Sequence, residues 1–333
     1  MKLRFHQFGP PAGQLGIEAC PPRPPAEDEV LLKVLASPIN PADLNFIEGS
    51  YGIVPPLPAT PGTEGCGEVL ESRHEAFAPG DRVMVLGRGE MWATHATVHG
   101  DLLFKLPAGI DPLQAAMLKV NPATAFRMLH GFVSVPPGGW VVQNAANSGV
   151  GRCVIQLCKA LGWRTMNLVR RAELAEELTA LGADAVVVDD ASGLDQAREI
   201  MAGESAWLAL NAVGGDSALR LMNLMADGGS HVTYGAMGRK PLKIPNGLLI
   251  FRDLSVHGFW LTRWLENARL PEVHRTYQLL GRMVLEGGLA VPVDSTHELT
   301  GFAAALDRLD AHDRKGKVLF TPAGADAAPA RAK

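Results

Sequence analysis

The residues with the clearest chemical potential form a run of small side chains that follows an apolar segment. The expected strand Trp140–Gln143 leads into a tight turn, where Ala146, Ser148 and Gly151 occupy the three positions of a GxGxxG fingerprint. Small side chains let the backbone approach a pyrophosphate closely, and the exposed N–H groups at a helix start bind such an anion. The turn therefore predicts a dinucleotide site.

Two arginines occupy the position that distinguishes NAD-binding from NADP-binding sequences. An NAD site usually has Asp or Glu about 20 residues beyond the fingerprint, where the carboxylate binds the ribose 2′-hydroxyl. Counting from Gly151, that place holds Arg170, with Arg171 beside it. Guanidinium groups bind a 2′-phosphate in a bidentate manner, whereas a carboxylate repels it. The sequence therefore predicts NADPH; the alternative is a plain strand–helix–strand unit with solvated arginines.

The elements around these residues alternate as in a doubly wound parallel sheet. A helix follows the turn, because apolar residues recur from Val154 to Leu161 at near-helical spacing and Gly162 ends it. Further strands are expected at Met166–Val169, Ala185–Val188, Ala206–Asn211, His231–Tyr234 and Leu254–Trp260, and helices at Ala172–Leu181, Leu194–Met201 and Ser217–Met225, the last closed by Gly228 and Gly229. This order predicts an α/β nucleotide-binding domain over residues 121–262.

Residues 1–120 show short apolar runs separated by Gly and Pro, which favours a partly closed barrel. Strands are expected at Val30–Ser37, Gly65–Glu71, Arg82–Leu86 and Trp92–Val98, with helical structure over Asp111–Leu118. The C-terminal part is expected to hold a helix near Glu272–Leu285, a strand Ser295–Leu299, a helix Phe302–Leu309 and a strand Lys317–Thr321. We expect it to return to the first domain, which then spans 1–120 and 263–322. The tail 323–333 is expected to be disordered.

Bulk composition narrows the classes of function. A length of 333 residues indicates two domains. The formal charge of −4 and the lack of a basic patch interleaved with aromatics argue against nucleic-acid binding. No run of 18 apolar residues indicates a membrane span. Cys20, Cys66, Cys153 and Cys158 form no CxxC pair, and with no signal or transit peptide recognisable they favour a reduced, cytoplasmic protein.

Five segments along the whole chain resemble the medium-chain dehydrogenase/reductase superfamily, and within it the 2-enoyl thioester reductase branch. They cover residues 40–65, 120–129, 143–171, 208–215 with 232–237, and 248–264. The resemblance implies an α/β protein with a GroES-like, partly closed β-barrel catalytic domain and a Rossmann domain. It also implies an NADPH-dependent reductase of activated C=C bonds, with hydride added to the β-carbon and a proton to the α-carbon.

The zinc enzymes of this superfamily require ligands that this chain lacks. Their catalytic zinc takes a Cys near the turn that begins at Asn40 and a His from a GHE motif. Here the turn reads Asn40-Pro41-Ala42-Asp43, and the motif reads Gly62-Thr63-Glu64. Because thiolate and imidazole ligands are missing, no tetrahedral site can be built, and we predict no bound metal.

Tyr51, in Gly49-Ser50-Tyr51-Gly52, matches the tyrosine that acts as proton donor in the enoyl reductase branch. A phenol has a reference pKa of about 10, so it stays protonated at neutral pH and can donate to an enolate. The alternative for Tyr51 is an aromatic turn residue that packs on Pro55 and Pro56.

The resemblance assigns the other site residues by position. Asn121 and Thr124 are expected beside the nicotinamide and the catalytic tyrosine. The pyrophosphate is expected to lie along Asn147, Ser148, Gly149 and Val150. Other parts of the cofactor are expected along Tyr234, Gly235, Ala236 and Met237. The nicotinamide is expected along Phe259, Trp260, Leu261 and Thr262, and a phosphate of the cofactor near Lys317. Core packing is the alternative for Phe259 and Trp260, and a solvated charge for Lys317.

Three classes of function remain open at this point. The first is reduction of trans-2-enoyl thioesters of CoA or acyl carrier protein. The second is reduction of quinones or small enones, as in the related quinone oxidoreductases, and the third is a non-enzymatic NADPH-binding role. The resemblance also implies a homodimer through the edge strand Leu254–Trp260, since an unpaired apolar edge promotes aggregation.

Overall fold

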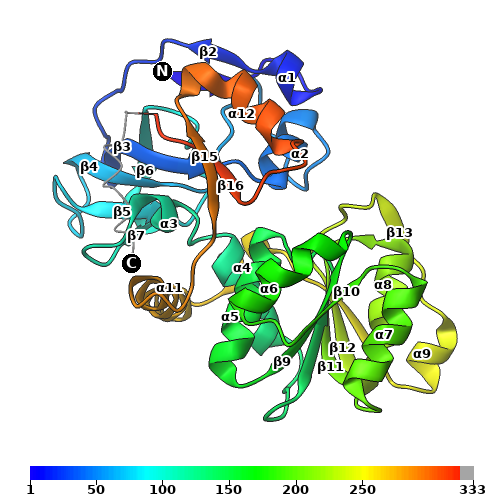
Figure 1. Cartoon of the computed structure of the whole chain (residues 1–333). Coiled ribbons are helices and arrows are strands. Elements are labelled where there is room, and N and C mark those ends of the chain that lie inside the picture. Colours follow the sequence, from blue (N-terminus) through cyan, green and yellow to red (C-terminus); the bar gives the residue numbers. More distant parts are fainter. Residues whose placement is uncertain (323–333) are drawn as a thin grey trace. The chain divides into compact units, whose positions relative to one another are not determined.

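The computed structural model describes residues 1–322 and divides into two compact units (Figure 1). Among the described residues, unit 1 comprises Met1–Val120 and residues 267–322, and unit 2 comprises Asn121–Glu266. The second boundary falls four residues later than the predicted one, inside helix α10 (Leu261–Asn267). The predicted disordered tail, 323–333, lies outside the described residues.

Unit 1 is built on a seven-stranded sheet in the order β15-β16-β3-β4-β5-β7, with β6 also paired to β3. The strands are β3 (Glu29–Pro38), β4 (Cys66–Ser72), β5 (Arg82–Val85), β6 (His95–His99), β7 (Leu103–Lys105), β15 (Val293–His297) and β16 (Lys317–Phe320). All pairs are antiparallel except β15 with β16. Because β16 pairs with β3, the C-terminal segment completes the sheet of the N-terminal one, as the sequence predicted.

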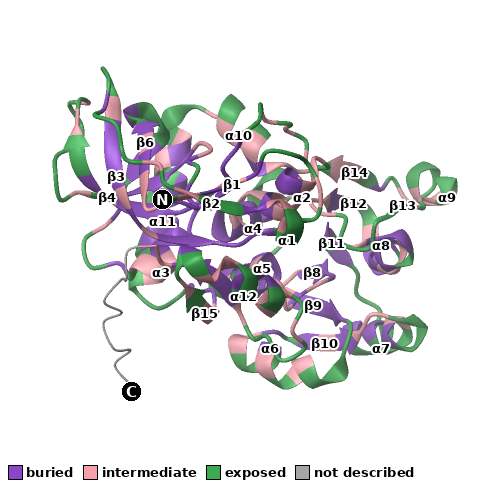
Figure 2. Cartoon of the chain, turned by 90° about the horizontal axis from the view of Figure 1, so that it is seen from above, coloured by how far each residue is buried: buried purple, intermediate pink, exposed green. Residues whose placement is uncertain are grey.

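Short elements surround this sheet. They are the strand pair β1 (Lys2–Arg4) and β2 (Gly16–Glu18), and the helices α1 (Pro11–Gln14), α2 (Pro41–Glu48), α3 (Pro112–Ala116), α11 (Leu270–Leu285) and α12 (Phe302–Leu309). A buried cluster that includes Phe5, Phe46, Trp92 and Phe320 joins the N-terminal strand, α2 and β16. Strands near the centre of the sheet are buried along most of their length (Figure 2).

Unit 2 is a six-stranded sheet in the order β10-β9-β8-β11-β12-β14, and every pair is parallel. The strands are β8 (Trp140–Gln143), β9 (Arg164–Val169), β10 (Ala185–Val188), β11 (Ala206–Asn211), β12 (Met225–Thr233) and β14 (Ser255–Gly258). The order reverses between β8 and β11, as in a doubly wound nucleotide-binding sheet. The predicted Rossmann architecture is therefore confirmed.

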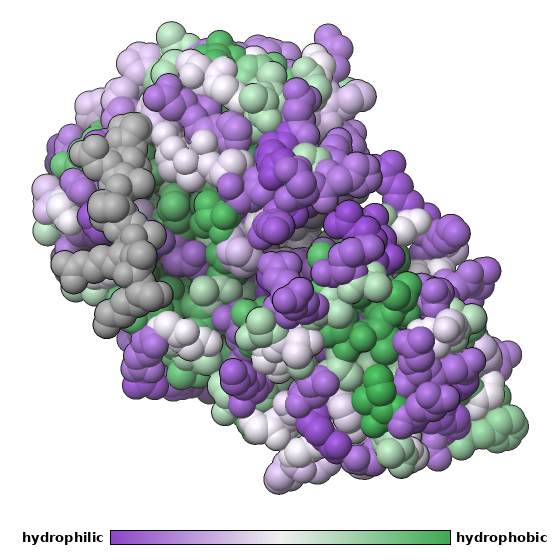
Figure 3. Space-filling view, viewed as in Figure 1, coloured by the Kyte–Doolittle hydropathy of each residue, from purple (hydrophilic) through white to green (hydrophobic). Residues whose placement is uncertain are grey.

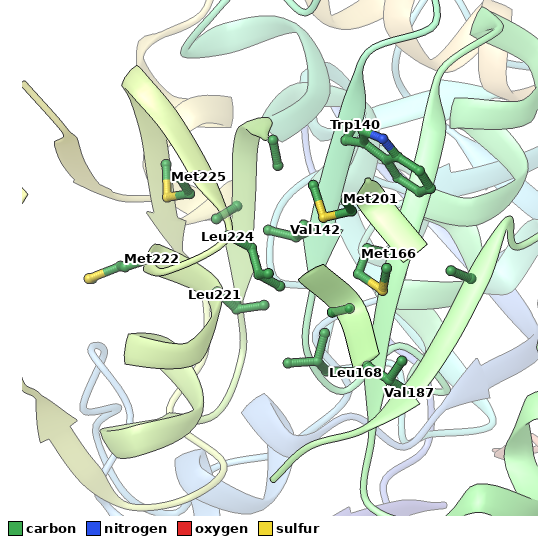
Figure 4. Packing of buried hydrophobic residues seen from close by; sticks show 14 of the residues in the cluster. Trp140, Val142, Met166, Leu168, Val187, Met201, Leu221, Met222, Leu224 and Met225 are labelled. Carbon is green, nitrogen blue, oxygen red and sulfur yellow. The ribbon is translucent and has the colours of Figure 1, made fainter. Parts of the chain in front are cut away.

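Helices cover both faces of the sheet in unit 2 (Figure 1). They are α4 (Asn121–Gly131), α5 (Gly149–Leu161), α6 (Ala175–Leu181), α7 (Ala191–Met201) and α8 (Gly215–Met222), and β13 (Lys240–Leu242) and α9 (Asn246–Ile250) lie before the edge strand. Trp140, Val142 and Met166 from the strands meet Met201 of α7 and Leu221 of α8 in one buried cluster (Figure 4). This core packs α7 and α8 against the strands of the sheet.

The structure corrects the expected bounds or types of several elements. The helix predicted to run to Met225 ends at Met222, and Met225 already begins β12, where it pairs with Ala206. Gly228 and Gly229 therefore lie inside a strand rather than at a helix end. The strands expected from Trp92 and up to Trp260 are shorter, since they begin at His95 and end at Gly258. Helix α2 appears where only a turn was expected.

On the face drawn in Figure 3, hydrophilic side chains dominate and apolar ones gather in smaller areas. Within residues 1–322 no helix has the length and apolar character needed to cross a membrane.

Candidate active site

The small-residue turn after β8 packs too closely to accept larger side chains. Ser148 is the N-cap of α5, and its Oγ accepts a hydrogen bond from Gly151 N at 3.1 Å. A Cβ on Gly151 would lie 2.5 Å from the carbonyl oxygen of Ala146, so this position requires glycine. The first N–H groups of α5 have no partner within the helix, and such groups suit the binding of a phosphate group.

Two of the predicted cofactor residues hold buried polar atoms without a partner in the described chain. The Nδ2 of Asn121 and the hydroxyl of Tyr234 are buried and make no hydrogen bond within residues 1–322. Burial raises the pKa of the Tyr234 phenol, which lies close to Ser148 but outside hydrogen-bonding geometry. Buried donors left unsatisfied are costly, so both atoms are suited to a polar ligand at this turn. The residues present therefore fit a dinucleotide.

The structure brings several predicted residues together in unit 2. A Cβ on Gly149 would lie 2.9 Å from the amide carbon of Asn121, which places Asn121 against the turn. Thr124 is buried in the same helix, α4. Segment 234–237 runs along the chain after β11, since Tyr234 N donates to Asn211 O at 3.0 Å and Met237 N to Ala212 O at 2.8 Å.

Arg170 and Arg171 follow β9 directly, and both side chains are exposed. They stand at the carboxyl end of a parallel strand next to β8, which leads into the turn. Ligands of doubly wound sheets bind at this end. Two exposed guanidinium groups make this edge suited to a phosphate.

Phe259 and its neighbours follow the edge strand β14, and most of them are half-buried. Phe259 N donates to Thr233 O at 2.9 Å, and its ring meets that of Phe132 edge-on at 6.2 Å. Trp260 and Thr262 are half-buried, and Leu261 is buried at the start of α10. Phe259 thus makes packing contacts within unit 2. Its predicted contact with the nicotinamide stays a prediction.

Tyr51 lies in unit 1 on a loop anchored to the end of α2. Gly49 caps the helix with φ of +77°, and the N–H groups of Ser50 and Tyr51 both donate to Asn45 O, at 2.9 and 3.2 Å. The half-buried Tyr51 ring packs on the cluster that contains Phe5 and Phe46. The main chain at Tyr51 is therefore fixed, while its side chain keeps access to solvent.

Arg88 is a site residue that sequence reasoning missed. Its guanidinium carbon lies 3.6 Å from the centroid of the Phe46 ring, a cation–π contact. Burial lowers the pKa of Arg88, while the nearby Asp43 carboxylate acts to raise it. The available signal was an arginine between two glycines three residues after the end of β5, since such a residue lies on a loop that follows a strand.

The residues at the positions of zinc ligands form a buried hydrogen-bond network in unit 1. The Asp43 carboxylate accepts from the backbone N–H groups of Asn40, Gly62 and Thr63, at 3.0, 3.2 and 2.8 Å. Glu64 accepts from Asn40 Nδ2 at 2.7 Å and from Val120 N at 2.8 Å. Burial raises the pKa of both carboxyl groups. Within residues 1–322 no three His, Cys, Asp or Glu residues gather as metal ligands.

Lys317 belongs to the same network. Its buried ammonium group donates to Asn40 Oδ1 and, at 3.4 Å, to Ile39 O. The sequence did not predict this buried environment. Because Lys317 is buried, it is not the solvated charge that the sequence analysis gave as the alternative to phosphate binding. A contact between Lys317 and a cofactor phosphate stays a prediction.

Comparison with known proteins gives the family. The GroES-like domain of alcohol dehydrogenases matches residues 26–108, and the zinc-binding dehydrogenase domain matches residues 149–278. The chain is 40% identical over 287 residues to the mitochondrial enoyl-[acyl-carrier-protein] reductase of Mus musculus. The aligned region covers 84% of this chain and 77% of that protein. This chain belongs to the medium-chain dehydrogenase/reductase superfamily. It is therefore an oxidoreductase, and its predicted GroES-like and Rossmann domains are confirmed.

Solved structures of this superfamily share the whole architecture. A putative NADPH:quinone reductase from Bacillus thuringiensis superimposes with a TM-score of 0.89 at 29% identity, covering 96% of this chain and 98% of that one. The complex of Etr1p with NADP and crotonyl-CoA superimposes with a TM-score of 0.84 at 28% identity and the same coverage. The similar structures thus include one named for quinone reduction and one solved with NADP and crotonyl-CoA.

Proposed function

We propose that this protein reduces trans-2-enoyl thioesters with NADPH. The observation that carries the proposal is the 40% identity to an enoyl-[acyl-carrier-protein] reductase over 84% of the chain. The match to Etr1p, which holds NADP and crotonyl-CoA, supports the same substrate class and cofactor. The bound cofactor supplies a hydride equivalent for the β-carbon of the substrate.

The chain's own residues account for binding and for the proton. The buried donors of Asn121 and Tyr234 supply hydrogen bonds to the cofactor, and Arg170 and Arg171 bind its 2′-phosphate. Tyr51 donates its phenolic proton to the α-carbon of the enolate. The fixed main chain at Tyr51 supports this role, because a proton donor must be held in position.

The test is consumption of NADPH with crotonyl-CoA, with and without the Tyr51 hydroxyl. Tyr51→Phe is expected to lower kcat on the thioester by about 10²- to 10⁴-fold, the usual contribution of a general acid. Phe46→Leu is the matched control, because it alters the ring on which Tyr51 packs and leaves the hydroxyl. Full thioester turnover by Tyr51→Phe would remove the acid from the proposal.

Quinone reduction is the second candidate, supported by the similarity to the Bacillus thuringiensis protein. A quinone accepts its protons on oxygen and does not need a carbon acid. Turnover of a simple quinone that is faster than that of crotonyl-CoA and equal in wild type and Tyr51→Phe would favour this reading.

We also propose a homodimer formed through the edge of the unit 2 sheet. Strand β14 pairs only with β12 among the described strands. At the end of α9, four to five residues before this strand, Ile250 and Phe251 are 68% and 82% exposed. Large exposed apolar side chains beside an open strand edge favour pairing with a second copy. A cytoplasmic location, expected from the sequence, stays a prediction that cell fractionation would test.

A further inference from the structure

A carboxylate lies beside the expected position of the cofactor 2′-phosphate. Strands β9 and β10 run parallel with Val169 opposite Val188, so Arg170 and Asp189 are the next residues of two neighbouring strands. Asp189 N donates to Val169 O at 2.7 Å, which keeps the two chains together at this point. An acidic group at this edge is unfavourable for a phosphorylated cofactor, because like charges repel.

The Asp189 carboxylate is buried and neutralised from α8. Its side chain is 9% exposed. Arg220 Nε donates to Asp189 Oδ1 at 2.7 Å, and Arg220 Nη2 donates to the main-chain oxygen of Asp189 at 2.9 Å. The second carboxylate oxygen, Oδ2, accepts from Ser217 Oγ at 2.5 Å. Both oxygens of Asp189 are thus engaged on the side of α8.

This ion pair connects to the small-residue turn through buried amides. Asn144, which directly follows β8, donates from Nδ2 to Ser217 Oγ at 2.8 Å and to Asn211 Oδ1 at 2.8 Å. Asn144 Oδ1 in turn accepts from Ala212 N at 2.7 Å. The network therefore joins the carboxyl ends of β8, β10 and β11, and it holds Asp189 in one orientation.

We propose that Arg220 determines the preference for NADPH by masking Asp189. With Arg220 in place, the charge of the Asp189 carboxylate beside Arg170 is compensated, and the Arg170 guanidinium is available to a 2′-phosphate. Without Arg220, the Asp189 carboxylate repels the 2′-phosphate and competes for Arg170. The inference rests on the proposed NADPH cofactor and adds a specificity residue that makes no contact with the cofactor itself.

The experiment measures dissociation constants of the full chain for NADP⁺ and NAD⁺ by calorimetry. Arg220→Gln is expected to weaken NADP⁺ binding roughly tenfold while NAD⁺ binding changes by less than about twofold. General damage to the fold affects both cofactors, so the ratio of the two constants isolates the charge at the 2′ position. Adding Asp189→Asn to Arg220→Gln is expected to restore the ratio, because the unpaired carboxylate is then gone.

Arg252→Gln is the matched control, since Arg252 pairs with Asp227 through the same Nε contact at 2.8 Å and also binds a main-chain oxygen, that of Met225. Asp227 lies near the start of β12, at the opposite end of the sheet from the arginines. The control is expected to leave the ratio unchanged. A ratio unaltered in Arg220→Gln overturns the inference alone. A wild-type protein without preference for NADP⁺ overturns both this inference and the proposed cofactor, whereas thioester turnover tests the reaction separately.

Discussion

Individual side chains decide which cofactor this protein is expected to use. Arg170 and Arg171 stand exposed at the end of β9, where NAD-dependent relatives of the fold carry a carboxylate. Arg170→Asp with Arg171→Ser is expected to raise the KM for NADPH by about 10- to 100-fold, because charge-assisted hydrogen bonds to the phosphate are lost. Steady-state kinetics with NADPH and NADH measures this.

Arg282→Asp, at an exposed position of α11 in unit 1, is the control for that change of charge. It is expected to leave both KM values as in wild type. If the double variant kept the wild-type preference for NADPH, the assignment of the arginines to the 2′-phosphate would be wrong.

His231 links stability to acid pH. The ring is fully buried in β12, and neither ring nitrogen makes a hydrogen bond within residues 1–322. Burial lowers the pKa of His231 to about 4, from about 6.5 in the unfolded chain. The unfolded state therefore binds the proton first, and stability is full above pH 6.5 and falls as the pH drops toward 4, by up to about 3 kcal/mol.

Urea unfolding between pH 7.5 and 4.5 measures this contribution. His231→Leu, which removes the titrating ring, is expected to flatten the decline, and His130→Gln at an exposed site is expected to leave it unchanged. An equally steep decline in His231→Leu would assign the acid sensitivity to other groups.

At the scale of elements, the turn between β8 and α5 depends on close backbone contact. Gly151→Ala is expected to destabilise the protein by about 1–3 kcal/mol, because the new methyl group would lie 2.5 Å from Ala146 O. The displaced turn is also expected to weaken NADP⁺ binding. Thermal unfolding and calorimetry report the two effects.

Gly131→Ala provides the comparison within unit 2, since no atom beyond its chain neighbours and its own helix backbone lies within 4 Å of the Cβ it would carry. It is expected to bind NADP⁺ as the wild type does. Wild-type stability and binding in Gly151→Ala would show that the turn adjusts without cost.

Local sequence signals predicted most elements, and the failures have physical causes. The start of helix α2 has a recognisable signal. Asn40 is followed by Pro41 at the first helical position, and Asp43 stands three residues after Asn40. The end of α8 could not be placed from periodicity. Met222, Leu224 and Met225 are all apolar, but the first ends the helix, the second lies in the connection and the third begins a strand. All three are buried in the same core, but Met225 belongs to a strand whose register with Ala206 is set by tertiary pairing.

At the scale of the whole molecule, the proposed dimer gives a prediction about assembly. Phe251→Glu is expected to shift the protein from dimer to monomer at micromolar concentration, because it places a charge on the 82% exposed apolar side chain before β14. Light scattering measures the mass. Val54→Glu, which alters a 63% exposed apolar residue of unit 1, is expected to remain dimeric. A wild type that is monomeric would contradict the proposal itself.

The sequence by itself determined the alternation of strands and helices in unit 2, the small-residue turn and the arginines after β9. These features follow from local spacing and from residue chemistry, so a linear reading reaches them. It also predicted that the last strand returns to the first domain. Only the tertiary structure showed the Asp189–Arg220 pair, the burial of Lys317 beside Asn40, and the stacking of Arg88 on Phe46. Asp189 and Arg220 are separated by 31 positions in the sequence, and Lys317 and Asn40 by 277. No local pattern encodes such contacts, because they arise when strands and helices pack.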